Sequence, residues 1–450
     1  MFAVEDLASR HKGVQMKRAL SLVVLLALVL SSAPVLTQPT GQVTIRVTLD
    51  GQPADALIFA QDRFGKVFIA YTDLKELGLA RLTLPQERYT LIVDRGAGFT
   101  TKPFAQEITV QVGKTLDVNV ALQRAFSPAI EWGYYSADLH THSTASLDGH
   151  TPVEQLVLVQ LAADLDLVFI SDHETIAGHE LFLKTAQARG VPAILSEEIT
   201  TPLGHWNAYP LSCAVTYAPG KTPKDYFAAA RACGTQIIQA NHPGSSGDGY
   251  FALLGTEIFD YNFDAVEIFN GEFDQGDAKA IEQLFKFWNE GRRYVAVGNS
   301  DDHDWMDFRF ERYGRPRTFV RVEGEVTVEK FIAALKSGRA FTTYGPLVNF
   351  TAQDGKALPG DTVTLSRGQE ISLKAELFVL PRDPSQEEPR TLQSAQIIKN
   401  GKVLKTFTLG EDRAVITLTD KPTERSWYLV RVVADDGDQA YTNPIWAEVQ

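Results

Sequence analysis

The sequence predicts an α/β domain with a closed or nearly closed barrel of seven strands, placed between two β-sandwich domains. Three observations lead to this prediction. Apolar and polar residues alternate in both flanking regions, which is typical of strands with one buried face. In the centre, short apolar strands alternate with helical stretches. Histidines and acidic residues follow the ends of successive central strands, as in barrels that build a site on one face.

Residues 41–125 predict the first β-sandwich. The segments V-T-I-R-V-T-L at 43–49 and L-D-V-N-V-A-L at 116–122 have the two-residue period of a half-buried strand. Gly and Pro turns separate such segments, which favours a small antiparallel sandwich.

Residues 126–346 predict the barrel domain, with 126–133 as the linker that leads into it. Helices are expected at 152–163, where Thr151 is the N-cap, at 223–232 and at 278–290. Alternation with helices implies a mainly parallel sheet, and seven strands favour closure. The expected strands are 135–139, 167–171, 191–195, 206–211, 235–240, 265–269 and 294–299.

Residues 347–450 predict a second β-sandwich, because helical patterns disappear and alternation returns, as at 370–378 and 427–433. Asn400-Gly401 is typical of a type I′ hairpin turn.

Residues 1–40 are interpreted as a signal peptide region with Met16 as the probable start. Lys17-Arg18 precede an apolar run at 19–30 and then small residues, which is the pattern of a secretory leader. The run is short for a membrane span, so an uncleaved anchor is disfavoured and no stable span is expected after cleavage. The chain is therefore expected to be exported, to the periplasm or the cell exterior. In such a protein Cys213 and Cys233 either pair or stay as two buried thiols, and both alternatives remain open.

The net charge of −13 at pH 7 argues against nucleic acid as the main partner, because a phosphate backbone selects a basic surface.

The histidines carry the main functional prediction. Of nine in the chain, eight lie between residues 140 and 303. Neutral imidazoles and carboxylates are the ligands of Zn²⁺, Mn²⁺ and iron. A single ion takes about four to six ligands, and the candidates exceed that number, which implies two or three ions. His150 and His179 are placed less regularly and are interpreted as structural, and His11 lies outside the mature chain. The candidate ligands at or beside strand ends include His140, His142, Asp148, His173, Glu198, His205, His242, Asp301 and His303.

These motifs resemble the metal motifs of the polymerase and histidinol phosphatase (PHP) superfamily. The matching segments are H-T-H-S-x-x-S-x-D-G (140–149), S-D-H-E-T (171–175), E-E-I-T (197–200), G-H-W (204–206), N-H-P (241–243) and S-D-D-H (300–303). The flanking β-domains and the leader are most similar to the CehA/McbA-type metallohydrolases of that superfamily. The resemblance implies a distorted (β/α)₇ barrel that holds two or three divalent ions.

The resemblance also implies a division of the ligands among the ions. One ion would take His140, His142, Glu198 and Asp301. Glu198, preferred to Glu197 from the matching position, would bridge to a second ion held by His205 and His242. A third position would use Asp148, His173 and His303, although some relatives have His where this chain has Asp148.

The predicted reaction is hydrolysis by water activated on the ions. The substrate is expected to be a small molecule, either a phosphoester or a carboxylic or carbamate ester, and the sequence leaves this choice open. Asp172 is expected to orient a ligand and Asn270 to bind substrate or line the barrel mouth. Arg317, with Arg309, Arg312 and Arg315, would bind an anionic substrate, unless these arginines pair with Asp304, Asp307 or Glu311. The aromatic residues Trp206, Phe269, Trp305 and Tyr344 either pack an aryl group or belong to the core. The alternative function is a surface protein that binds the cell wall or a glycan and whose barrel holds metal structurally.

Overall fold

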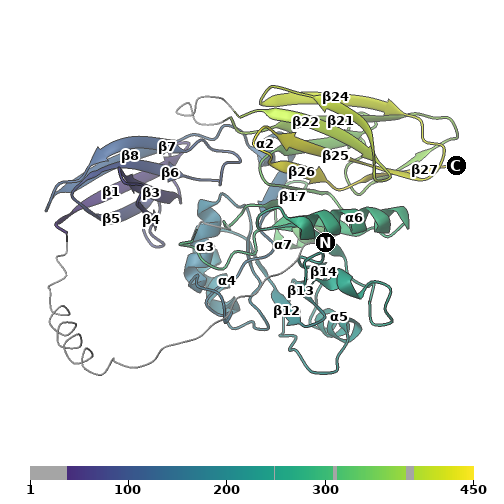
Figure 1. The fold of residues 1–450 in the computed structure, drawn as a ribbon, viewed down its shortest axis with the longest axis horizontal. Coiled ribbons are helices and arrows are strands. Elements are labelled where there is room, and N and C mark those ends of the chain that lie inside the picture. Colours follow the sequence, from purple (N-terminus) through teal and green to yellow (C-terminus); the bar gives the residue numbers. More distant parts are fainter. Residues whose placement is uncertain (1–37, 248, 308–311, 382–389) are drawn as a thin grey trace, which may run out of the picture.

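The computed structural model describes residues 38–247, 249–307, 312–381 and 390–450 (Figure 1). The predicted signal peptide region up to residue 37, Met16, His11, Arg309 and Glu311 lie outside the described residues. Figure 1 shows two β-rich regions along one side of the molecule and the helix-containing region on the other. No helix within the described ranges is long and apolar enough to span a bilayer.

The N-terminal region consists of two four-stranded sheets around one hydrophobic core. One sheet has the order β2-β1-β5, with β8 also paired to β1, and the other has the order β4-β3-β6-β7. Alternate residues of β1 are buried, which follows the alternation in the sequence. The strands are β1 (Thr40–Leu49), β2 (Gln52–Pro53), β3 (Leu57–Asp62), β4 (Val67–Tyr71), β5 (Leu79–Pro85), β6 (Arg88–Asp94), β7 (Phe104–Thr109) and β8 (Thr115–Leu122).

The central region is mixed α/β. Its helices are α2 (Pro128–Trp132), α3 (Val153–Ala162), α4 (His179–Arg189), α5 (Pro223–Ala232), the 3₁₀ turn η2 (Tyr250–Leu253), α6 (Gln275–Asn289) and α7 (Val328–Lys336). Its strands are β9 (Tyr134–Ala137), β10 (Val168–Ile170), β11 (Ala193–Leu195), β12 (Glu197–Thr201), β13 (Gly204–Tyr209), β14 (Ile237–Ala240), β15 (Ala265–Asn270), β16 (Val295–Asn299), β17 (Arg317–Arg321) and β18 (Ala340–Thr343).

The central strands belong to three sheets rather than to one parallel sheet. β10 and β11 pair in parallel, and β12-β13-β14-β15-β16 form a mixed sheet in which β12-β13 and β13-β14 are antiparallel. β9, β17 and β18 pair antiparallel in a third sheet. Strand pairs among the described residues do not join these sheets into one ring, so the seven-stranded barrel stays a prediction. The structure adds β12, which is not among the expected strands, and Gly204 at φ 136° lets the chain turn back into β13.

The C-terminal region is all β and shares a sheet with the centre. β18 pairs with β26 antiparallel, so a nine-stranded sheet runs from β9 into the C-terminal strands. The three-stranded sheet β19-β21-β24 and the C-terminal strands of the nine-stranded sheet pack on one hydrophobic core. The predicted boundary at residue 346 therefore separates two regions whose backbone hydrogen bonding is continuous. The strands are β19 (Leu347–Ala352), β20 (Thr362–Leu365), β21 (Ile371–Phe378), β22 (Leu392–Lys399), β23 (Lys402–Thr408), β24 (Arg413–Asp420), β25 (Ser426–Ala434), β26 (Gln439–Thr442) and β27 (Ile445–Val449).

Candidate metal centre

The histidines and acids that follow the central strands meet in one cluster. Three overlapping groups have one nitrogen or oxygen ligand atom per residue, with all the atoms of a group within 4.8 Å of one another. The first group is His140, His142, Glu198 and Asp301; the second is Glu198, His205 and His242; the third is His142, His173 and His303. The cluster includes every predicted ligand except Asp148.

The first group has the spacing of a metal site. His140 Nε2 lies 3.2 Å from Glu198 Oε2 and 3.1 Å from Asp301 Oδ1. His142 Nε2 lies 3.4 Å and 3.0 Å from the same two oxygens. Ligand atoms bound tetrahedrally to Zn²⁺ stand about 3.4 Å apart, given metal–ligand bonds of about 2.1 Å. The four side chains therefore already have the separations that one ion requires.

Glu198 joins the first group to the second through its two oxygens. Its Oε1 lies 3.2 Å from His205 Nδ1 and 3.5 Å from His242 Nε2. Strand β12 explains the orientation, because successive side chains of a strand point to opposite faces. Glu197 accordingly points elsewhere and accepts a hydrogen bond from the Val215 backbone N–H at 2.9 Å. This arrangement supports the choice of Glu198 over Glu197.

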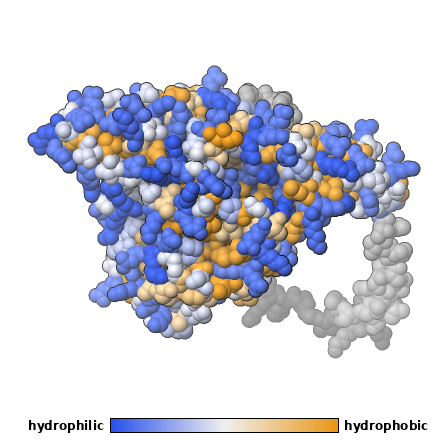
Figure 2. Space-filling model, turned by 180° about the vertical axis from the view of Figure 1, so that it is seen from behind, coloured by the Kyte–Doolittle hydropathy of each residue, from blue (hydrophilic) through white to orange (hydrophobic). Residues whose placement is uncertain are grey.

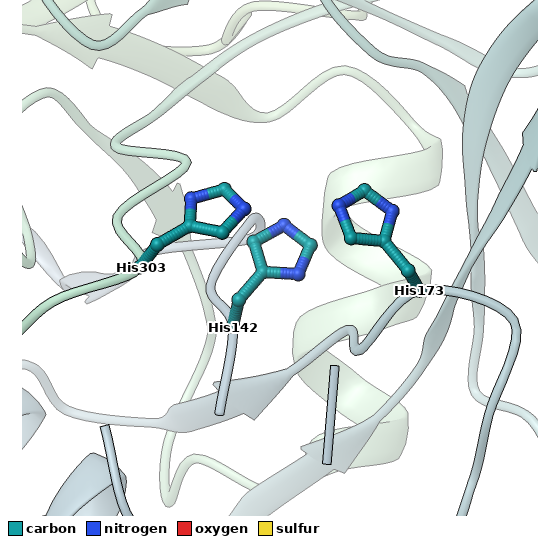
Figure 3. A group of neighbouring side chains, drawn as sticks. All are labelled: His142, His173 and His303. Atoms are coloured by element: carbon teal, nitrogen blue, oxygen red, sulfur yellow. The ribbon is translucent and has the colours of Figure 1, made fainter. Parts of the chain in front are cut away.

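The third group differs from the predicted ligand set. The ring of His142 lies between those of His173 and His303, with centroid distances of 4.4 and 4.1 Å (Figure 3). Asp148, predicted as the third ligand here, is 58% exposed, and its Oδ2 lies 3.4 Å from His173 Nε2 and 3.7 Å from His303 Nε2. The structure thus brings His142 into this group and leaves Asp148 at its solvent side.

Four of the imidazoles are oriented by oxygen acceptors at Nδ1. His140 Nδ1 lies 3.2 Å from Glu267 Oε1, and His303 Nδ1 lies 2.7 Å from the Asp301 carbonyl. His142 Nδ1 lies 3.3 Å from Ser146 Oγ, and His173 Nδ1 lies 2.6 Å from Thr200 Oγ1. When each ring carries a single proton, these partners place it on Nδ1 and leave Nε2 as a lone-pair donor. Metal-ligating histidines typically have such an acceptor behind them.

Unsatisfied buried atoms show that divalent ions fit this cluster. Glu198 Oε2 and His205 Nδ1 are buried without a hydrogen-bond partner. With its proton on Nδ1, His142 also turns an unprotonated Nε2 toward Asp301 Oδ1 at 3.0 Å. Two lone-pair atoms at that distance repel each other unless a cation lies between them. The donor set of imidazole nitrogens and carboxylate oxygens suits Zn²⁺, Mn²⁺ or iron.

The pKa shifts of the cluster follow from burial and mutual contacts. Burial opposes the charged form of His140, but Asp301, Glu198 and Glu267 outweigh it and raise the His140 pKa well above its usual range. Burial lowers the pKa of His142 to about 4, so this ring is neutral. Burial disfavours ionised Glu198, yet its histidine neighbours hold the pKa well below the usual range. The carboxylates therefore stay ionised and attract cations.

Two residues predicted to assist the reaction contact the cluster. The Asp172 carboxylate accepts hydrogen bonds from the Ser143 N–H at 2.6 Å and from Ser146 Oγ at 3.2 Å. Because Ser146 Oγ in turn lies beside His142 Nδ1, Asp172 orients that ring indirectly. Asn270 donates from Nδ2 to Asp301 Oδ2 at 3.2 Å, so it holds a candidate ligand.

Glu267, which was not among the predicted site residues, has a fully buried side chain on β15. Its carboxylate accepts from Asn299 Nδ2 at 2.9 Å and from the His242 N–H at 2.7 Å, and it faces His140 Nδ1. Asn241, also not predicted as a site residue, donates from Nδ2 to Glu198 Oε1 at 2.9 Å. An acidic residue inside the apolar strand A-V-E-I-F-N was the available sequence signal for Glu267.

The described arginines all have partners within the protein. Arg317 is 1% exposed and donates to the carbonyls of Gly314 at 2.6 Å and Ala163 at 2.8 Å. A side chain so enclosed and so bonded supports the fold, which corrects the prediction that it binds substrate. Arg312 pairs with Asp94, and Arg315 donates to Asp438 at 2.7 Å, so their partners come from the flanking β-regions.

Other candidates have structural contacts. His179 donates from Nε2 to the Ser196 carbonyl at 2.8 Å, and the side chain of His150 is exposed. Trp206 and Phe269 are completely buried in a core cluster, which supports the core interpretation of these two aromatic rings. Cys213 and Cys233 form a disulfide.

The family model of the PHP domain matches residues 138–238, and no curated protein matches the chain. Among solved structures, a two-domain protein from Bacteroides vulgatus that contains a predicted PHP-like metal-dependent phosphoesterase is 18% identical, with a TM-score of 0.40 over 69% of this chain and 95% of that one. A candidate metal-dependent phosphoesterase from Bifidobacterium adolescentis is 16% identical, with a TM-score of 0.30, and the match covers 44% of this chain and 95% of that one. An amidohydrolase from Chromobacterium violaceum, with bound sulfate and no metal, is 13% identical, with a TM-score of 0.29. The match covers 37% of this chain and 87% of that one. The matched segment begins at Asp138 and includes five of the predicted ligands that meet in the cluster, so residues 138–238 are similar to a PHP domain.

Proposed function

We propose that this chain is a metal-dependent hydrolase that acts on a small-molecule ester and holds two or three divalent ions. The observation that carries the proposal is the set of imidazoles whose Nδ1 atoms face oxygen acceptors and whose Nε2 atoms surround Glu198 and Asp301. Such an arrangement orients ligand atoms before any ion binds.

Ions bound there would supply Lewis-acid activation of water and of the ester oxygen, as Zn, Mn or Fe does in multinuclear hydrolases. The chain contributes the rest. Glu198 holds the first and second groups together, Glu267 and Ser146 fix the orientation of His140 and His142, and Asn270 restrains the free oxygen of Asp301. Asp148, with its exposed carboxylate, lies beside His173 at the solvent side of the third group.

Three finer assignments belong to this proposal. The PHP domain is proposed to close as a distorted (β/α)₇ barrel and to be of the CehA/McbA type, which the flanking β-regions support. The protein is proposed to be exported to the periplasm or cell exterior, and the Cys213–Cys233 disulfide agrees with an oxidising compartment. The substrate is proposed to be a phosphoester or a carboxylic or carbamate ester.

The test is a parallel assay of the Mn²⁺- or Zn²⁺-loaded protein on a phosphodiester, a phosphomonoester, an aryl ester and a carbamate. Chelator-sensitive turnover of any of them supports the proposal, and the preferred ester names the class. His173→Ala should abolish turnover, whereas His150→Ala, which removes an exposed imidazole, should not. Full activity of His173→Ala would contradict the proposal, and metal binding without turnover of any ester would favour a binding protein with a structural metal site.

A further inference from the structure

The N-terminal β-region contacts the loop that carries two candidate ligands. Tyr71, the last residue of β4, donates from its hydroxyl to the Trp305 carbonyl at 3.1 Å. The two rings also stack, with centroids 5.5 Å apart and an interplanar angle of 20°. Trp305 lies two residues after His303, so a side chain from the first β-region reaches the edge of the metal cluster.

Hydrogen bonds continue from Trp305 to His142. The Trp305 N–H donates to Thr151 Oγ1 at 3.0 Å, and Thr151 Oγ1 lies 2.7 Å from the Tyr313 hydroxyl. The Tyr313 hydroxyl donates to the His142 carbonyl at 3.1 Å, and Thr151 Oγ1 donates to the His303 carbonyl at 3.4 Å. Successive bonds of this kind polarise and strengthen one another. These hydrogen bonds connect the Trp305 backbone to the backbone of His142, a member of the first and third groups.

The loop has a conformation that needs such support. Asp301 has a φ of 56°, in the left-handed region that non-glycine residues rarely adopt. The His303 carbonyl accepts from the His150 N–H at 2.7 Å, and His303 Nδ1 bonds to the Asp301 carbonyl. Backbone strain of this kind persists only where the surroundings impose it.

The N-terminal region is itself firmly attached to the PHP domain. Arg95 and Arg124 both pair with Asp164, which follows α3, and Arg189 of α4 pairs with Asp55. Asp164 is 8% exposed, so these ion pairs are largely shielded from solvent. Tyr71 therefore extends from a fixed support rather than from a mobile domain.

We propose that Tyr71 is a positioning residue that holds His303 and Asp301 in place, and that the N-terminal β-region is thereby part of the metal centre. The proposal rests on the proposed metal-dependent function for its consequence, since a displaced His303 weakens the third group. It gives the first β-region a role that its own residues do not otherwise reveal.

The experiment compares Tyr71→Phe and Tyr71→Ala with Tyr89→Phe in the full-length protein. Tyr89 is a matched control, because it lies in the same region and its hydroxyl also donates to a backbone carbonyl, that of Pro85, at 3.0 Å. The first readout is the rate of amide hydrogen exchange in residues 301–306, measured without added metal. The second is metal binding, measured as the number of Mn²⁺ ions bound per molecule and as the absorption spectrum of the Co²⁺-loaded protein.

Tyr71→Phe should speed exchange of the loop by about fivefold, the effect of one lost hydrogen bond, and Tyr71→Ala should speed it further. Both variants should lose the most weakly bound ion and change the Co²⁺ spectrum, while Tyr89→Phe changes neither. Unaltered loop exchange in Tyr71→Ala, or unaltered metal content and spectrum, would overturn the proposal. If the wild-type protein bound no metal, the proposed function would fail, and the exchange readout alone would decide whether Tyr71 holds the loop.

Discussion

Glu198→Gln tests the candidate metal centre at its most connected residue. Its Oε2 lies 3.0–3.4 Å from the nearest nitrogens of His140, His142 and His173, and its Oε1 lies 3.2–3.5 Å from those of His205 and His242. The substitution keeps the shape of the side chain but removes its charge and replaces one oxygen with an N–H₂ group, which cannot bind a cation.

The expected size of the effect follows from these contacts. Loss of a single residue that only supports a metal ligand typically lowers metal affinity by about 10- to 100-fold. Glu198 belongs to two of the three groups, so we expect a loss of at least about 100-fold in affinity, or about 2.7 kcal/mol. Turnover at a fixed metal concentration should decrease by at least the same factor.

Glu197→Gln is the matched control, because the same substitution is made one residue away on the opposite face of β12. Burial raises the pKa of Glu197 to about 7, so a neutral side chain is tolerated there. The assay is metal titration by calorimetry together with turnover, with circular dichroism to verify folding. Equal metal affinity in folded Glu198→Gln and Glu197→Gln would refute the assignment of Glu198 as the shared ligand.

Three further predictions follow from the contacts described above. Arg317→Met should lower the free energy of unfolding by about 2–4 kcal/mol in a denaturant titration, because two buried carbonyls lose their donor. The metal content per folded molecule should stay the same. A variant that is as stable as the wild type but inactive would instead support the predicted role of Arg317 in binding substrate. Burial opposes protonation of His242, but its hydrogen bond to Glu198 and the charges of Asp301 and Glu198 raise its pKa to about 9, so below that pH metal must displace a proton. Metal affinity should therefore rise by about tenfold per pH unit and per proton between about pH 6 and 9, with proton release that is measurable by calorimetry in buffers of different ionisation enthalpy. Replacing Cys213 and Cys233 together by Ala should destabilise the folded state by about 3 kcal/mol, read as a lower Tm, since the bond closes a loop with a sequence separation of 20.

The helix-containing region lies beside both flanking β-regions (Figure 1). Side chains of these regions therefore bond to residues far away in the sequence, as Tyr71 does to Trp305. Figure 2 shows hydrophilic side chains over much of the outer surface and apolar patches across the middle of this face. Arg312 and Arg315 each reach a carboxylate of a different flanking region. Both flanking β-regions therefore contact the same loop of the central region.

The sequence by itself determined the features that depend on local periodicity. The two-residue alternation predicted strands in both β-regions that the structure contains, such as β1, β8, β21 and β25, because neighbours along a strand report which face is buried. The histidines that follow strand ends predicted the cluster. The same period accounts for Glu198 facing the cluster while Glu197 faces away.

Only the tertiary structure decided which distant side chains meet. Glu267 comes 127 residues after His140, and Trp305 comes 234 residues after Tyr71, so no local pattern relates the members of either pair. The same holds for Arg317, whose charge predicted a substrate contact until its carbonyl partners were known. Strand direction was also decided at this level: Gly204 turns β12 back into β13, and a chain reversal of this kind replaces a parallel neighbour with an antiparallel one. Contacts between distant segments depend on the path of the whole chain, and that path minimises the free energy of all the packed elements together rather than of any one segment.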